Sequence, residues 1–95
     1  MLKENLKKII QYYLDNDKNM REAQVATSDL ISRLNRDVEG NISEKRLLAS
    51  LGINYEEFIK EIEEIGKFQD RWDKIQEAGR EMQQEELMLM LSIKK

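Results

Sequence analysis

The sequence predicts an all-α fold, a small helical bundle of four to five helices with a long C-terminal helix used for self-association. Two observations favour helices throughout: the chain contains no proline, and only four glycines interrupt it. A third is that apolar residues recur at spacings of three and four, as they do along one face of a helix. With 95 residues and 40% hydrophobic side chains the chain can form one core, so we expect a single domain over residues 1–95.

The first two helices follow from an apolar stripe, a polar run and a second stripe. Residues 2–15 predict an amphipathic helix, with Lys3, Lys7 and Lys8 on the face opposite the apolar one. The polar run 15–19 then predicts a turn that supplies the N-cap of the next helix. That helix is expected at about residues 20–38. Its inward side chains are predicted to be Ala23, Ala26, Leu30, Ile31, Leu34 and Val38.

Two helix starts in the middle of the chain carry matching signals. Ser43 is expected to cap a short helix over residues 44–51, and Asn54 is expected to cap a helix that begins at residue 55. Gly52, between them, suits the left-handed residue that ends a helix. In each case apolar residues flank the cap and are expected to touch: Ile42 with Leu47, and Ile53 with Phe58.

The rest of the chain predicts one long helix over residues 67–92, which follows a bend or break near Gly66. We therefore divide the domain into a bundle, 1–66, and an oligomerisation element, 67–95. Such a helix is roughly 39 Å long, whereas a compact domain of this size has a radius of gyration of about 12 Å. Because the bundle cannot cover it fully, we expect it to join a second copy. The predicted self-association residues are Phe68, Trp72, Ile75, Met82, Leu87, Leu89, Met90 and Ile93.

Composition argues against catalysis. The chain has neither Cys nor His, so the thiol nucleophile, the imidazole base and the usual zinc ligands are missing. The run 15–19 offers the first ligands of a calcium loop, but Met20 replaces its turn glycine and Ala26 replaces its bidentate glutamate. We therefore expect no catalytic residues, no cofactor, no metal ion and no enzyme activity.

Residues 43–65 resemble a helix-turn-helix, with Leu48, Gly52, Ile53 and Phe58 at the expected apolar and turn positions. The resemblance implies a DNA-binding regulator, but the second helix carries five glutamates and a single cation. Such a helix is poorly suited to phosphates, and the net charge of −3 likewise disfavours nucleic acid. The same carboxylates could instead dock into a basic groove on a protein partner. We call them the acidic ridge: Glu56, Glu57, Glu61, Glu63 and Glu64.

The leading hypothesis is a non-enzymatic protein-binding module, such as a regulator, adaptor or inhibitor from a bacterium or its phage, acting as a dimer or higher homo-oligomer. Two alternatives stay open: a DNA-binding regulator with a degenerate helix-turn-helix at 43–65, and a small-molecule or nucleotide binder at an oligomer interface. No membrane partner is expected, because the apolar run that begins at Leu87 is short and acidic residues precede it. We expect a cytoplasmic protein.

Overall fold

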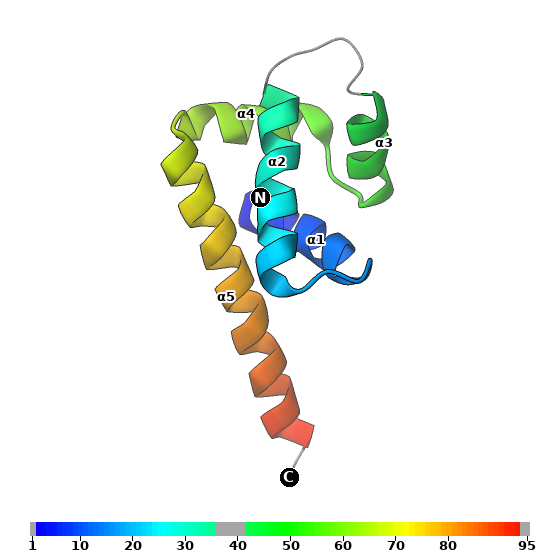
Figure 1. The fold of residues 1–95 in the computed structure, drawn as a ribbon, viewed down its shortest axis with the longest axis vertical. Coiled ribbons are helices and arrows are strands. Elements are labelled where there is room, and N and C mark those ends of the chain that lie inside the picture. The colour runs from blue at the N-terminus through cyan, green and yellow to red at the C-terminus, as the bar shows by residue number, and fades with distance from the viewer. Residues whose placement is uncertain (1, 36–41, 94–95) are drawn as a thin grey trace.

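The computed structural model describes residues 2–35 and 42–93, with the side chains of Asn35, Ile42 and Ile93 left out of the description. Within these ranges the chain is all-α, as predicted (Figure 1). In Figure 1, α4 crosses the top of the molecule, and α5 runs down past α2 and α1 until its end extends below them. The helices are α1 (Leu2–Leu14), α2 (Met20–Asn35), α3 (Ile42–Ser50), α4 (Tyr55–Ile65) and α5 (Phe68–Ile93).

The start of α2 is fixed by a reciprocal cap. The backbone N–H of Glu22 donates to Asn19 Oδ1 at 2.8 Å, and the backbone N–H of Asn19 donates to Glu22 Oε1 at 3.0 Å. This capping box satisfies two backbone donors at the start of the helix. The predicted turn at 15–19 is confirmed, and Asp17 adopts a left-handed φ of 66° within it.

The turn between α3 and α4 is also the predicted one. Gly52 has a φ of 75°, and the N–H groups of Gly52 and Ile53 donate to the carbonyls of Ala49 and Leu48 at 3.0 and 2.9 Å. This pair of bonds is a Schellman motif, in which a left-handed glycine ends the helix. Asn54 then caps α4, its Oδ1 accepting from the N–H of Glu57 at 3.1 Å.

The predicted cap at Ser43 is wrong. Helix α3 already includes Ile42, so Ser43 lies inside the first turn and not at the extended position that a capping residue adopts. The expected contact between Ile42 and Leu47 falls outside the described side chains. The second flanking pair is found in the core, where Ile53 and Phe58 are both buried.

The break between α4 and α5 occurs at Gly66, where it was predicted. Helix α4 ends at Ile65, and Gly66 follows with a φ of 70°. This positive φ, which glycine adopts without steric cost, lets the chain change direction before α5 begins at Phe68.

The core lies between α1, α2, α4 and α5, with Leu48 added from α3 and Ile53 from the α3–α4 turn. Helices α2 and α5 approach closely at Gly79, where an added Cβ would meet the end of the Gln24 side chain and lie 3.1 Å from Met20 Sδ. The predicted inner face of α2 needs one correction, because Thr27 is fully buried while Ala26 is only half-buried. The Thr27 hydroxyl donates to the carbonyl of Ala23 at 2.7 Å, which satisfies its polar atom in the core. Val38 lies outside the described residues.

Candidate docking surface on the last helix

Helix α5 contributes its first half to the core of its own chain. Ile75 and Ala78 are fully buried, and Trp72 and Met82 pack half-buried against the core. Because α1, α2 and α4 cover this half, Ile75 is not available on the surface where we placed it for self-association. The chain does break between α4 and α5 near residue 66. The first half of α5 nevertheless packs in the core of the bundle, so the bundle does not end at that residue.

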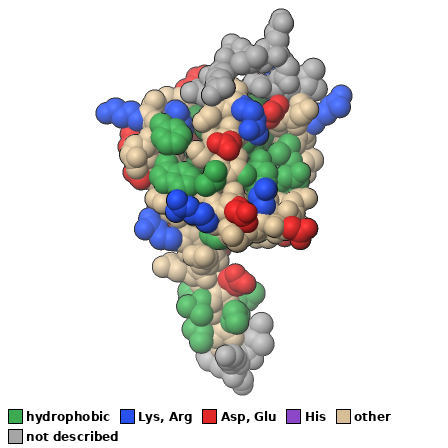
Figure 2. Space-filling view, viewed as in Figure 1, with side chains coloured by type: hydrophobic (Ala, Val, Ile, Leu, Met, Phe, Trp, Pro, Cys, Tyr) green, Lys and Arg blue, Asp and Glu red, His purple; other side chains and the backbone are tan. Residues whose placement is uncertain are grey.

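The last turns of α5 extend past the bundle and begin with five consecutive apolar residues. Residues 87–91, which we call the apolar tip, have relative exposures between 51% and 68%. Figure 2 shows hydrophobic side chains on this projecting part of the molecule. Three predicted self-association residues, Leu87, Leu89 and Met90, lie in the tip, and Met88 and Leu91 belong to it as well. The predicted residue Ile93 is the last position of α5, and its side chain is not described.

A ladder of ion pairs between α1 and α5, which we call the ionic clamp, holds α5 just before the tip begins. Lys3 Nζ lies 3.0 Å from Glu77 Oε1 and 2.6 Å from Glu81 Oε2. Lys7 Nζ lies 3.4 Å from Glu81 Oε1 and 2.6 Å from Glu85 Oε1. Hydrogen bonds from the ammonium groups lower the pKa of Glu81, and the carboxylate bonds raise the pKa of Lys3 and of Lys7.

The sequence pattern predicts Lys3 and Lys7 on the face of the first helix opposite its apolar stripe. It does not predict that they pair with carboxylates of α5. A signal for this pairing is nevertheless present in the sequence, because the lysines are spaced by four residues and so are Glu77, Glu81 and Glu85. Which helix faces which could not be read from that spacing alone.

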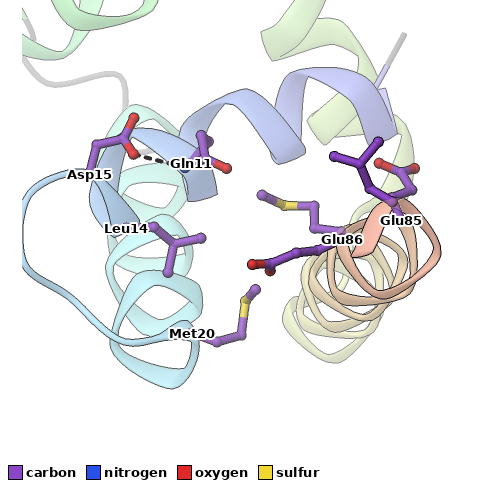
Figure 3. A pocket seen from close by; sticks show the side chains of 8 residues that line it. Gln11, Leu14, Asp15, Met20, Glu85 and Glu86 are labelled. Atoms are coloured by element: carbon purple, nitrogen blue, oxygen red, sulfur yellow. Dashed lines mark hydrogen bonds between the residues drawn. The ribbon is translucent and has the colours of Figure 1, made fainter. Parts of the chain in front are cut away.

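Beside the tip, a groove of about 580 Å³ opens between the end of α1, the start of α2 and α5. Figure 3 shows Leu14 and Met20 on one side of this space, with Glu85 and Glu86 on α5 across from them. It combines apolar side chains with three carboxylates, so we call it the acidic groove. Its lining residues are Gln11, Leu14, Asp15, Met20, Met82, Glu85, Glu86 and Leu89.

The remaining predicted self-association residues lie at the opposite end of α5. Phe68 is 57% exposed, and together with Trp72 and Val25 it lines a second, smaller groove of about 350 Å³ between α2 and α5. The predicted surface therefore divides into this patch, a buried middle and the apolar tip. Of these three parts, only the tip carries exposed apolar side chains on every side of the helix.

The acidic ridge lies on α4, whose opposite face buries Phe58 and Ile62. Of the ridge residues, Glu61 is half-buried and the others are exposed. Lys60 is also exposed on this helix, so the outer face of α4 remains strongly negative.

Among residues 2–35 and 42–93, no three acidic side chains come together in a way that could hold a metal ion. No helix in the same ranges combines the length and apolarity needed to cross a membrane. No protein-family model, curated protein or solved structure matches this chain. The function is therefore inferred from the surfaces described above.

Proposed function

We propose that this chain is a cytoplasmic, non-enzymatic protein-binding module, acting as a regulator, adaptor or inhibitor, whose copies associate through the apolar tip. The observation that carries the proposal is the exposure of five consecutive apolar side chains, Leu87 to Leu91, at 51–68% each. Burying a leucine or methionine side chain is worth about 1.5–3 kcal/mol, so leaving this tip in water forgoes a large stabilisation. A helix that is apolar all round is normally covered on more than one side.

A protein partner would dock on the acidic ridge. The ridge and the tip belong to opposite ends of the molecule, since α4 crosses the top and the end of α5 reaches the bottom (Figure 1). Self-association through the tip therefore leaves the ridge accessible. The exposed carboxylates on α4 favour a partner with a basic surface, because complementary charges speed encounter and fix orientation.

The same carboxylates weigh against the DNA-binding alternative. Gly52 has the positive φ that the resemblance to a helix-turn-helix would require, but the exposed side of α4 presents Glu56, Glu57, Glu63 and Glu64. Phosphates repel such a face, and reading bases in the major groove requires donors such as Arg, Asn or Gln.

Light scattering on the native chain and on two variants tests the proposal. We expect the native mass to exceed 11.3 kDa and to fall to that value when Leu87, Leu89 and Leu91 are all replaced by serine. Phe68→Ser is the matched control, because it removes an apolar side chain of the same 57% exposure as Leu87 from the other end of α5. A mass that is unaffected by the three tip substitutions would refute the role of the tip.

A further inference from the structure

We infer that the groove between α2 and the start of α5 binds an arginine side chain of the protein partner, with the guanidinium group against Phe68 and Trp72 and its N–H groups on Asp29. This inference rests on the proposed function, because it names what the partner must carry. Figure 2 shows hydrophobic side chains beside α2 where this groove lies. We call it the aromatic groove, and its lining residues are Val25, Ser28, Asp29, Phe68, Gln69 and Trp72.

Two pairs of side chains, each spaced by about one helical turn, line the aromatic groove from its two helices. Val25 and Asp29 lie four residues apart on α2, and Phe68 and Trp72 lie four residues apart on α5. The two helices run in opposite directions, as the colours in Figure 1 show. Phe68 therefore lies toward the Asp29 end of the groove, and Trp72 lies toward the Val25 end.

The aromatic side chains leave ring surface available to a ligand. Phe68 is more than half exposed, and Trp72 is half-buried where it packs against the core. Although both rings line the groove, they make no ring contact with each other. A guanidinium group is attracted to the face of an aromatic ring and stacks on it. The groove can therefore receive the flat side of such a group.

The polar atoms of the aromatic groove suit a cationic donor. Asp29 is its one charged lining residue, and within the described part of the chain this carboxylate makes no hydrogen bond or ion pair. The Gln69 side-chain N–H donates to Asp73 Oδ1 at 3.1 Å, which leaves the Gln69 carbonyl oxygen able to accept. Lys67 and Arg71 are close in sequence but are not among the described residues that line the groove.

An arginine side chain satisfies the rings and the acceptors together. Its five N–H donors lie in one plane and can reach carboxylate and carbonyl oxygens, while its faces lie against the rings. A lysine ammonium group has donors but no flat face, and a quaternary ammonium group has no donor. The apolar tip of a second copy has no charged residue between positions 87 and 91, so it would cover Asp29 without supplying a cation.

The aromatic groove adjoins the acidic ridge, where we propose that the basic partner docks. Glu64, the last residue of the ridge, precedes Phe68 by four residues, so their Cα atoms are at most about 15 Å apart. One partner surface can therefore reach both places. The ridge would attract its positive charge, and the arginine would anchor it, since arginine and tryptophan are common among the residues that dominate binding energy.

Trp72 provides a direct readout, because it is the single tryptophan of the chain. The probe is arginine blocked at both ends, N-acetyl-arginine-N-methylamide, which is titrated into the full chain while tryptophan fluorescence is recorded. We expect a saturable change with a dissociation constant on the order of 1 mM. Citrulline blocked in the same way has nearly the shape of arginine without its charge, and it should bind about tenfold more weakly. Blocked lysine should bind about threefold more weakly.

Substitutions at two exposed positions test the individual contacts. Asp29→Asn should weaken the binding of blocked arginine by about tenfold and leave the weak binding of blocked citrulline unchanged. Phe68→Leu keeps an apolar side chain but removes the ring, and it should weaken arginine binding by about two- to fivefold. Asp70→Asn is the matched control and should retain the native affinity, since Asp70 is an exposed carboxylate near the start of α5 that does not line the groove.

Several results would overturn the inference. These are the lack of a saturable response to blocked arginine, equal affinities for arginine and citrulline, and equal affinities of the Asp29→Asn and Asp70→Asn chains. Much tighter binding of free arginine than of blocked arginine would indicate a small-molecule site instead of a partner's side chain. A lower native mass in Phe68→Ser would show that a second copy covers the groove. The proposed self-association is tested separately, by the mass of the tip variant, which none of these titrations measures.

Discussion

The two halves of α5 share one helix and one apolar pattern, but only the first half is covered. Ile75 and Ala78 are fully buried where α5 packs against α1 and α2, whereas Leu89, two heptads beyond Ile75, is 65% exposed. The difference arises from the neighbours, because the bundle ends near Glu85, where the ionic clamp also ends. An apolar stripe indicates that a helix is covered by other protein atoms. Whether those atoms belong to the same chain depends on how far its other helices extend along the stripe.

The largest expected effect comes from the buried half. Ile75→Ala should lower the free energy of unfolding by about 2–5 kcal/mol, because it removes a fully buried side chain and leaves a cavity in the core. Urea denaturation measures the loss. Leu89→Ala, at the same face two heptads away, is the comparison variant and should change the stability of the single chain by less than about 0.5 kcal/mol. Equal losses of unfolding free energy for the two variants would contradict the difference in burial between the two halves of α5.

Removing the exposed half should have a much smaller effect on folding. A chain that ends at Glu86 keeps every buried residue of α5 and the whole ionic clamp, so its free energy of unfolding should stay within about 1 kcal/mol of the native value. Circular dichroism with thermal melting measures this, at concentrations low enough to dissociate the native chain. The shortened chain should also be monomeric in solution. If it is unfolded, the tip contributes to the core of its own copy.

The smallest expected effect concerns pH. Because the clamp lowers the pKa of Glu81 in the folded chain, its contribution is complete above the ordinary glutamate value of 4.5 and is lost as the pH falls through the lower folded-state pKa. The pKa values of Lys3 and Lys7 are raised, so their contribution is complete below 10.5 and is lost as the pH rises through the folded-state values.

Thermal melting from neutral to acidic pH measures this contribution. Glu81→Gln should lower the melting temperature slightly at neutral pH and weaken its dependence on acid. Glu64→Gln, an exposed glutamate outside the clamp, is the control and should retain the native profile. The effect is small because solvent screens exposed ion pairs. Identical acid profiles for Glu81→Gln and the native chain would show that the clamp does not contribute to the dependence of stability on acid.

Local signals in the sequence predicted the helix ends well. Gly52, Asn54 and Gly66 each act through the backbone of their own turn, and the structure confirms all three. Ser43 failed because the prediction rested on residue type, and the helical backbone begins before it. The capping box of Asn19 and Glu22 has the same three-residue spacing as the pair Asn54 and Glu57, so the sequence signal was present although only the turn was predicted.

Features that depend on how helices meet could not be predicted from the sequence. The spacing along α5 grouped Ile75 with Leu89, because a helical stripe carries no information on where the covering helices end. The ionic clamp and the acidic groove join α5 to α1 and to the start of α2, regions more than 60 residues away in sequence. The elongated shape was anticipated, and the radius of gyration is 14.0 Å against the roughly 12 Å of a compact domain.

Sedimentation equilibrium of the native chain across a range of concentrations tests the central claim most directly. If the apolar tip is sheltered by another copy, the mass should rise with concentration to at least twice the 11.3 kDa of one chain. A mass that stays at 11.3 kDa up to tens of micromolar, with residues 87–91 still exposed, would contradict it.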